Sequence, residues 1–548
     1  MTEKVMLTIA EYIRLVHLLQ RLGAIDLVVV RIPEKCKLNC MNTPHQSEDI
    51  ERLHRLGYPQ ELKRILGGFS NYALSLSIIC IVAGGITSFH VGYAAVGGAA
   101  IGIVWPVWTV ISLCVALAMG QVASAFPTAG GLYHWAAILG GRFWGFFVAW
   151  LNLAGLVTVL AAINVGSVRF AESLLDSNLD NPWIQALLVA AITFSQALIN
   201  HKGISLTRIL IDFSGWWILG VSAAIITSVL MAAPSLDIAR AFTWTNLSGT
   251  PEGDASVWPA SDSIVWLAFM SALLPAYTIT GFDASAHAAE ETIDAAREVP
   301  LGMVRSVVVS GIVGWVMLGV VVISIQDPRV VAESGENAFM TALRHAVGSG
   351  MAMALGLSAC VGQYLCGLAT VTAASRMTYA FARDGGLPYS VTLARVSPGT
   401  RAPVAAIWAV SVTSVLFTVW TPVYATIASV CTMLLYLSYV VPLVLAARAL
   451  GRTWTELGPF QLGRWFIPAS MVSVIGCAGL VVIGVQPPND QALIVLVAFG
   501  AGLMVFWFCL ARFSFTGPPA GMLTSARLKT ILAIEKLEEE ADTGGVSP

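Results

Sequence analysis

The stretch Ile81–Ser88 reads IVAGGITS, and the stretch Tyr277–Asp283 reads YTITGFD. Each places glycine inside a long hydrophobic segment, and the two stretches lie far apart in the chain. In a bilayer every backbone N–H and C=O needs a partner, so a broken helix persists only where it lines a cavity within the protein. Paired breaks at corresponding places in two halves of a chain are typical of a transporter's substrate site. The two stretches therefore predict a membrane protein that moves a small polar solute.

Composition excludes an aqueous globular protein. Of the 548 residues, 57% are hydrophobic and only 11% are charged, against about 25% charged in soluble domains. The mean hydropathy is +0.76. Runs such as Ile101–Ala125 and Phe143–Val168 contain no charged residue, and each exceeds the roughly 20 residues that cross the hydrocarbon core. We therefore predict an all-α polytopic membrane protein.

The length rule places about twelve transmembrane helices along the chain. Their predicted bounds are 69–93, 101–126, 143–170, 183–200, 207–233, 262–289, 304–325, 351–378, 403–420, 422–446, 465–485 and 490–511.

Gly84 and Gly281 are separated by about the length of a unit of five spans. An odd number of spans makes the second unit enter the membrane from the opposite side, which predicts a 5+5 inverted repeat with two further helices at the C-terminal end. The predicted divisions are a cytoplasmic tail (1–68), a first repeat (69–233), an extracytoplasmic loop (234–261), a second repeat (262–446), helices 11 and 12 (447–511) and a cytoplasmic tail (512–548). Within the first tail, Leu53–Leu66 is predicted to form an amphipathic helix on the membrane surface.

The distribution of basic residues predicts the orientation. With the N-terminus in the cytoplasm, only Arg169, Arg240, Arg329 and Arg344 fall on the outer side. Cytoplasmic loops carry an excess of Lys and Arg, so this bias predicts that both termini are cytoplasmic. We expect a multi-pass protein of the plasma membrane.

The first break offers backbone groups to a ligand. A half-helix that starts beyond a break has free N–H groups and a partial positive charge, which suit a carboxylate. Glycine has no Cβ, so a ligand can approach the backbone closely. The alternative is close helix packing, since small residues are common where membrane helices meet. The candidate substrate-binding residues here are Ala83, Gly84, Gly85, Ile86 and Thr87.

The second break offers carbonyls to a substrate ammonium and carries two aromatic rings. Tyr277 and Phe282 are candidates to cap the site or to hold a quaternary ammonium by cation–π contact. The alternative is that both rings pack between helices. The candidate substrate-binding residues here are Tyr277, Thr278, Thr280, Gly281 and Phe282.

Asp283 is the candidate for coupling or gating, because an ionisable group within a span is a functional candidate by default. It is a possible proton carrier or conformational sensor, and the alternative is that it only caps a helix or forms a structural pair. We expect no metal site and no cofactor. The sequence also contains no G-x-x-x-x-G-K-[ST] loop to bind ATP, and we expect neither enzyme activity nor a nucleic-acid partner.

At these residues the chain resembles the amino acid–polyamine–organocation superfamily, and within it the amino acid/choline transporter branch that includes GABA permeases. Four stretches carry the resemblance: Ala83–Ser88 (AGGITS), Ala123–Trp135 (ASAFPTAGGLYHW), Thr278–Glu291 (TITGFDASAHAAEE) and Ser375–Pro388 (SRMTYAFARDGGLP).

The resemblance implies a leucine-transporter-like fold that works by alternating access. In such proteins the first broken helix binds the substrate carboxylate and the sixth binds its amine, Tyr277 stands where relatives place a gating aromatic, and Asp283 stands where many relatives carry an acid. Phe126–Gly131 and Arg376–Gly386 match loops of the inner gate. One departure concerns coupling: some bacterial relatives use a lysine in the fifth span, where this chain has Trp216 and Trp217.

The leading hypothesis is secondary active transport of an amino acid or related amine, with GABA as a candidate, across the bilayer and with a proton or sodium as a possible coupling ion. The first alternative is a choline or polyamine permease of the same fold. The second is an amino acid sensor that does not transport.

Overall fold

The computed structural model describes residues 44–543, apart from 176–180, 254–255, 421–423, 488 and 520–524. Over these residues the chain is helical, and its only β-pairings are two isolated bridges. The helices at the predicted spans are α3 (Gly68–Ile79), η1 (Ile81–Gly85) and α4 (Phe89–Val96), then η2 (Ala100–Val104) and α5 (Trp105–Ala125), α7 (Arg142–Leu174), α8 (Pro182–His201), α9 (Ile204–Ala232), α10 (Ile264–Ser271), α11 (Leu273–Thr278) and α12 (Ala284–His287), α13 (Ala295–Ser324), α16 (Ser349–Arg383), α18 (Val404–Trp420), α19 (Tyr424–Ala449), α20 (Phe466–Gly484), and α21 (Asp490–Phe506) with η8 (Trp507–Ala511).

Every predicted span coincides with a helix or a broken helix. Ten helical segments of the described chain are long and apolar enough to cross a bilayer. Two shorter apolar helices, Ile264–Thr278 and Val404–Val419, stand at the sixth and ninth predicted spans. The all-α polytopic prediction is confirmed. The seventh span begins earlier than predicted, at Ala295, and continues through Pro300.

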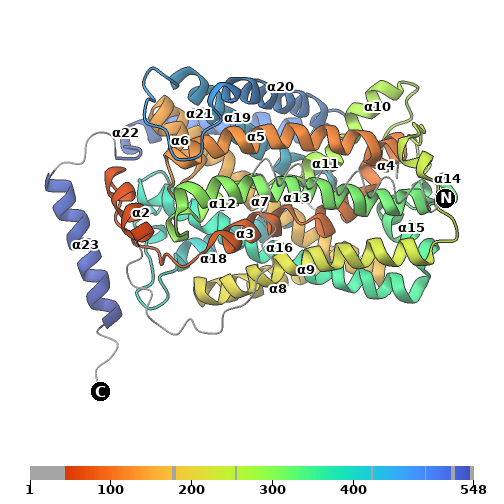
Figure 1. The fold of residues 1–548 in the computed structure, drawn as a ribbon, viewed down its shortest axis with the longest axis horizontal. Helices are drawn as coiled ribbons and strands as arrows, with labels where there is room; N and C mark the ends of the chain where they lie inside the picture. Colours follow the sequence, from red (N-terminus) through yellow and green to blue (C-terminus); the bar gives the residue numbers. More distant parts are fainter. Residues whose placement is uncertain are drawn as a thin grey trace. The chain divides into compact units, whose positions relative to one another are not determined.

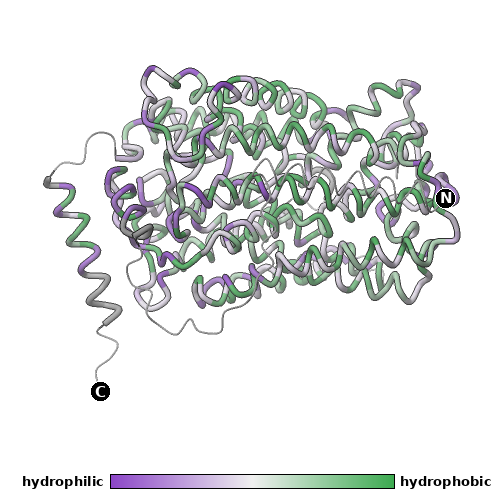
Figure 2. Tube along the Cα trace, in the orientation of Figure 1, coloured by the Kyte–Doolittle hydropathy of each residue, from purple (hydrophilic) through white to green (hydrophobic). Residues whose placement is uncertain are grey.

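The outward faces of these helices are apolar, as a lipid environment requires. Trp183, Phe213 and Ile494 are large hydrophobic side chains that remain exposed. Hydrophobic residues occupy most of the helix lengths, and hydrophilic residues gather toward the two ends of the bundle (Figure 2). A helix that is hydrophobic all round belongs in a membrane or in a large core.

Shorter helices lie at the two ends of the bundle (Figure 1). We call one end the α2 end and the other the α15 end. The short helices are α2 (Pro44–Arg55), α6 (Leu132–Gly140), α17 (Ser390–Leu393), α22 (Arg512–Ser514) and α23 (Ser525–Thr543) at the α2 end, and η3 (Ile238–Phe242), α14 (Pro328–Glu333), η6 (Gly335–Asn337) and α15 (Ala338–Val347) at the α15 end.

The predicted amphipathic helix over Leu53–Leu66 is wrong. The helix α2 ends at Arg55, and the chain then turns at Gly57, whose φ is +87°. The following segment is held inside the protein, because the N–H groups of Ile65 and Leu66 both donate to the carbonyl of Glu291. Gly57 takes a backbone conformation that favours glycine, and Pro59 lacks the N–H that a helix needs as a donor. The apolar residues of this segment are therefore buried in the protein instead of forming one face of a surface helix.

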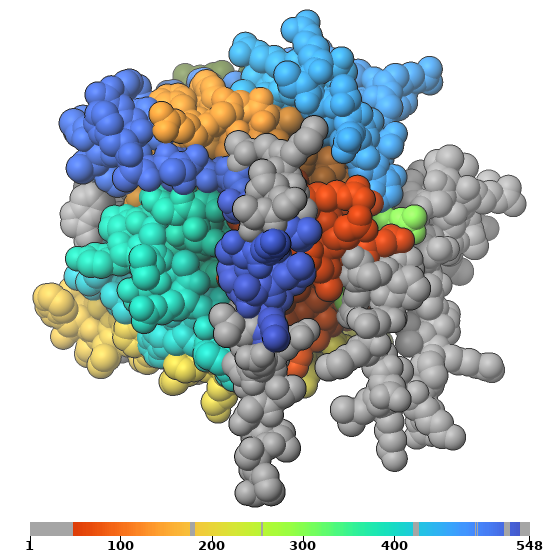
Figure 3. Space-filling view, turned by 90° about the vertical axis from the view of Figure 1, so that its left-hand side faces the viewer, coloured from red at the N-terminus to blue at the C-terminus, as the bar shows by residue number. Residues whose placement is uncertain are grey.

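The C-terminal helix α23 packs against this segment at the α2 end. The side chain of His54 lies 2.7 Å from a carboxylate oxygen of Glu535, and Arg527 donates to the carbonyl of Gly57. Figure 3 looks onto this end, with α23 in dark blue and the N-terminal segment in red.

Long helices surround the two broken spans. The helix α13 packs along both α3 and α5, while α7 packs along α19 and α16. The breaks are thus enclosed by α7, α13, α16 and α19. The division into two inverted repeats, with its boundaries, stays a prediction.

Candidate functional site

The first span breaks just before its glycine pair. The helix α3 ends at Ile79, and Cys80 adopts a left-handed conformation with φ of 31° and ψ of 78°. A wide π-helical turn follows over Ile81–Gly85, and such turns are frequent at functional sites. The break therefore starts at Cys80, while Gly84 lies within the turn.

The second span breaks over Ile279–Asp283, between α11 and α12. Gly281 has φ of +84°, and a Cβ built on it would lie 2.3 Å from the Cγ2 of Ile78. Only glycine fits here, for both the backbone conformation and the space. The Gly281 N–H, which no helix satisfies, donates to the hydroxyl of Tyr439 at 3.1 Å.

The two breaks touch each other. A Cβ on Gly84 would lie 3.2 Å from the Cα of Thr278. The missing side chain thus allows the turn of the first span to lie directly against α11. Gly84 therefore has the packing role that the sequence analysis gave as an alternative, and it also lies beside a cavity.

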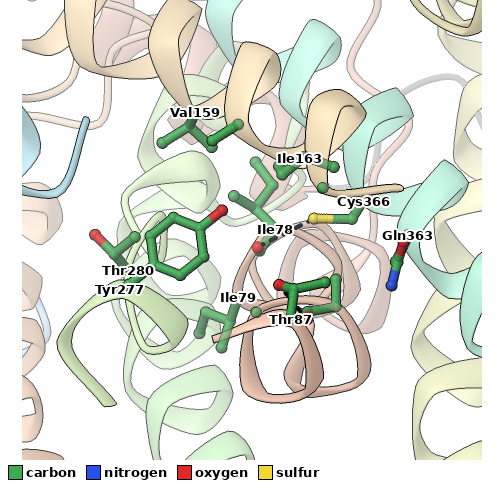
Figure 4. Close-up of a pocket in the computed structure, with 13 residues that line it drawn as sticks. Ile78, Ile79, Thr87, Val159, Ile163, Tyr277, Thr280, Gln363 and Cys366 are labelled. Atoms are coloured by element: carbon green, nitrogen blue, oxygen red, sulfur yellow. Dashed lines mark hydrogen bonds between the residues drawn. The ribbon is translucent and has the colours of Figure 1, made fainter. Parts of the chain in front are cut away.

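A small cavity lies between the breaks, α7 and α16 (Figure 4). Its volume is about 20 Å³, which is room for about one water molecule. No charged side chain lines it among the described residues. The lining residues are Ile78, Ile79, Ala83, Gly84, Thr87, Val159, Ala162, Ile163, Gly166, Tyr277, Thr280, Gln363 and Cys366.

Half of the predicted substrate-binding residues line this cavity. Those that line it are Ala83, Gly84, Thr87, Tyr277 and Thr280. Those that the structure does not bring to it are Gly85, Ile86, Thr278, Gly281 and Phe282.

The residues away from the cavity have packing or backbone roles. Gly85 faces Leu318 of α13, and the hydroxyl of Thr278 donates to the carbonyl of Leu274. Phe282 is fully buried against the ring of Tyr439, with ring centroids 5.1 Å apart.

Ile86 is also buried, at the edge of a separate small pocket toward the α15 end. For Phe282 the packing alternative describes the position, and Tyr277 remains the one aromatic ring among the described residues that line the cavity.

Sequence reasoning missed Gln363. This side chain lies on α16, lines the cavity and is 1% exposed, and neither of its amide atoms has a hydrogen-bond partner within the described chain. A buried unpaired amide is costly and calls for an explanation. The signal was available, because Gln363 is a polar residue within the uncharged run Met351–Ser375.

Asp283 lies beyond the second break and does not line the cavity. Its carboxylate is fully buried and accepts hydrogen bonds from Tyr439 at 2.7 Å and from Asn152 at 2.9 Å. The Nε2 of His287 lies 3.3 Å from the same oxygen that Asn152 contacts. The predicted acid is thus paired, with three partners that the sequence analysis did not name. Asn152 and His287 are polar residues in or near predicted spans, so the same signal applied to them.

Two buried ion pairs close the α2 end. Arg383 makes a two-pronged contact with Glu290 at 2.8 and 3.0 Å, and Arg376 makes one with Glu291 at 3.0 Å on both prongs. The N–H of Ala129 also donates to Glu290. Burial raises the pKa of Glu290, but the charge and hydrogen bonds of Arg383 outweigh it and hold that pKa below its ordinary value. The stretches that match inner-gate loops, Phe126–Gly131 and Arg376–Gly386, therefore meet here.

A third cluster surrounds Asp384. Its Oδ2 accepts from the hydroxyls of Tyr58 and Tyr133 at 2.8 and 2.7 Å, and the Nε2 of His134 lies 3.0 Å away. Burial raises the pKa of Asp384, but the hydrogen bond and charge of His134, with the charge of Arg383, hold it below its ordinary value. The N-terminal segment thus joins the closure through Tyr58.

Comparison with known proteins identifies the family of this chain. The family model described as amino acid permease matches residues 66–515. The chain belongs to the amino acid permease family. The permease is 30% identical to the amino-acid permease BAT1 of Arabidopsis thaliana over 510 residues, which cover 86% of this chain and 96% of that protein.

A rice homolog of BAT1, from Oryza sativa subsp. japonica, is also 30% identical, over 85% of the permease and 95% of its own length. An uncharacterized amino-acid permease of Schizosaccharomyces pombe is 26% identical over 90% of the permease and 91% of its own length. These matches confirm the prediction that the permease belongs to the amino acid–polyamine–organocation superfamily. The permease is an amino acid transporter of the membrane and not an enzyme.

Proposed function

We propose that the permease is a secondary active transporter that moves an amino acid, or a close analogue such as GABA, across the plasma membrane by alternating access. The observation that carries this proposal is the cavity between two touching helix breaks. Broken helices expose main-chain dipoles that bind the charged ends of a substrate at mid-membrane depth.

The lining of the cavity favours a zwitterion over a polyamine. No carboxylate among the described residues lines it, so a ligand with several positive charges would find no side chain of opposite charge there. A zwitterion needs only the two opposite ends of the half-helices. A single aromatic ring, Tyr277, also gives less support to a quaternary ammonium than a cage of rings would.

Gln363 is proposed as a specificity residue. Its unpaired amide carries both donor and acceptor atoms at the cavity wall. The apolar side of the cavity, formed by Val159 and Ile163 of α7, would face the hydrophobic part of the substrate. Because the cavity holds about one water molecule, the half-helices must move away from α7 or α16 to admit an amino acid.

Closures on both sides of the cavity support alternating access. Tyr277 lines the cavity and also a pocket of about 200 Å³ toward the α15 end. The buried ion pairs of Glu290 and Glu291 stand at the α2 end. We propose that the α2 end is cytoplasmic, because the four arginines assigned to the outer side, Arg169, Arg240, Arg329 and Arg344, lie on helices or loops of the α15 end.

The test is competitive uptake in proteoliposomes, with amino acids, GABA, choline and putrescine as competitors and with sodium or pH gradients imposed in turn. Competition that requires a carboxylate supports the proposal, and competition by choline or putrescine alone overturns it. Binding without accumulation would support the sensor alternative instead.

A matched pair of variants tests the site. Gly281→Leu should abolish uptake while the protein still reaches the membrane, because a side chain there would overlap Ile78. Gly220→Leu is the control, since Gly220 lies on α9 and a Cβ there meets nothing within 4 Å. Normal uptake by the Gly281 variant would remove this break from the site.

A further inference from the structure

We propose that Asp283 and His287 together form a proton-binding site, and that Tyr439 links this site to the break of the sixth span. The proposal rests on the proposed transport function and deepens it by naming H⁺ as the coupling ion. It assigns roles to His287 and Tyr439, which stand beyond the substrate cavity.

The hydrogen-bond partners fix how many protons the pair holds. The Nδ1 of His287 faces the carbonyl oxygen of Ala129 at 3.2 Å, and a carbonyl only accepts, so Nδ1 carries a proton. The Nε2 faces the Oδ2 of Asp283 at 3.3 Å. That contact requires one more proton, either on Nε2 as an imidazolium or on Oδ2 as a carboxylic acid. In both cases the pair is neutral overall and holds one exchangeable proton.

The other contacts of Asp283 add no second exchangeable proton to the pair. Asn152 donates its amide N–H to Oδ2. Tyr439 accepts the N–H of Gly281 and donates its own proton to Oδ1. Every neighbour of the carboxyl group therefore either donates to it or shares the one proton with it.

Burial makes the occupancy of this proton costly to change. Both side chains are fully buried, and no Lys or Arg of the described chain forms an ion pair with either of them. The titratable groups that contact Asp283 are His287 on α12 and Tyr439 on α19, while the contacts from α7 and from the Ala129 loop are an amide and a carbonyl. Loss of the proton would leave a buried negative charge with no cation beside it, which is strongly unfavourable in a closed protein.

The pair lies between the substrate cavity and the α2-end closure. Toward the cavity, Tyr439 holds the N–H of Gly281, and Thr280 beside it lines the cavity. Toward the α2 end, Ala129 contacts His287 through its carbonyl and Glu290 through its N–H. Opening of the α2 end would separate this loop from His287 and admit water, so the proton can then leave to that side. While the α2 end is closed, Tyr439 and the break at Gly281 connect the pair to the cavity, from which a proton can be taken up. A proton taken up on one side and released on the other is proton symport.

The experiment compares proton and substrate fluxes in proteoliposomes. We expect the wild type to accumulate substrate when the outside is acidic, with proton influx followed by an internal pH dye. His287→Gln retains a hydrogen-bonding side chain but cannot hold the charge, and should abolish proton-driven accumulation. Exchange of labelled for unlabelled substrate at equal pH needs no net proton movement and should remain. His345→Gln, on the exposed face of α15, is the matched control.

Asp283→Asn is a second variant that tests the proposal if His287→Gln fails to fold. It should fold, because the amide imitates the protonated acid and keeps the site neutral. It should exchange substrate at all pH values and accumulate none. Tyr439→Phe should keep the proton site and weaken its link to the break, so fewer protons should move for each substrate.

Three outcomes separate the two proposals. Wild-type accumulation without proton influx, or accumulation driven by sodium alone, would overturn the proton site and leave the transport proposal standing. Absence of both exchange and accumulation in the wild type would overturn transport. A pH titration of the purified protein then decides the proton site by itself. The variant with both Asp283→Asn and His287→Gln should bind one proton fewer than the wild type, and an equal count would refute the pair.

Discussion

The two ends of the bundle close the cavity by different means. At the α2 end, Arg376 and Arg383 each pair with a glutamate, and all four side chains are buried or nearly so. At the α15 end, Tyr277 lines both the cavity and a pocket of about 200 Å³. The ion pair near that pocket, Arg169 with Glu336, has side chains 33% and 54% exposed.

The closure at the α2 end is the stronger of the two. A buried pair with two-pronged geometry costs several kcal/mol to break by removing one partner, whereas an exposed pair contributes about 0–1 kcal/mol. The α2 end thus has two buried ion pairs, whereas the α15 end has Tyr277 and a more exposed ion pair. We expect substrate to reach the cavity first from the α15 end.

The largest effect is expected from Arg376→Ala. Its loss leaves the carboxylate of Glu291 buried without a partner, which should cost about 3–5 kcal/mol of the closed state. Uptake should collapse, and a thiol probe should reach the α2 end much faster than in the wild type. Arg55→Ala is the control, since that arginine pairs with Glu51 on an exposed surface. Equal behaviour of the two variants would mean that the α2 end is not the stronger closure.

The next effect is expected from Tyr277→Ala, which should join the cavity to the pocket at the α15 end. The KM for substrate should rise about tenfold, equivalent to about 1.4 kcal/mol of lost contact. Exposed Tyr389 supplies the control variant, Tyr389→Ala. An unchanged KM and unchanged accessibility would show that another group closes this end.

A smaller effect is expected from acid at the α2 end. The pKa of Asp384 is held below its ordinary value. Its contribution to stability is therefore fully present above the ordinary carboxylate pKa of about 3.9 and is lost as the pH falls through the lowered pKa. The Tm of the purified wild type should drop over that acidic range. Asp384→Asn should flatten this part of the profile, and a wild-type slope in the variant would assign the effect to other carboxylates.

The smallest effect is expected from Arg169→Ala at the α15 end. The pair with Glu336 is partly exposed, so its loss should change stability by less than about 1 kcal/mol. A Tm shift as large as that of Arg376→Ala would contradict the comparison between the ends.

The sequence predicted the spans well, because contact with lipid requires a certain length and an apolar surface. Both properties can be read from each segment without knowing how the segments pack. It also predicted both breaks, since backbone groups in a membrane must be satisfied and glycine marks where they are not. It did not predict that the first break begins at Cys80. This residue is not glycine, and yet its backbone adopts a left-handed conformation. The thiol of Cys80 donates to the carbonyl of Gly362 on α16, and local propensity does not report such contacts between distant spans.

The site was predicted only in part for a similar reason. Gly281 and Gly84 are required for close approach of backbone and side chains, but which neighbour approaches, Ile78 or Thr278, depends on how distant spans pack. For Phe282 the sequence left open whether the ring faces a ligand or packs between helices, and in the structure it is buried beside Tyr439. The error over Leu53–Leu66 has the same origin, because apolar spacing does not distinguish a membrane surface from a protein interior.

Residues 283–291 carry the proposed proton site and both carboxylates of the α2-end closure on one short piece of chain. Its far end is tied down, since the carbonyl of Glu291 accepts from Ile65 and Leu66. The fixed spacing between His287 and Glu290 thus links movement of the α2-end closure to movement of the proton site. A single alanine inserted after Ala288 would keep every functional group and lengthen this segment by one residue. Proton release and opening of the α2 end should then each still occur, but no longer together.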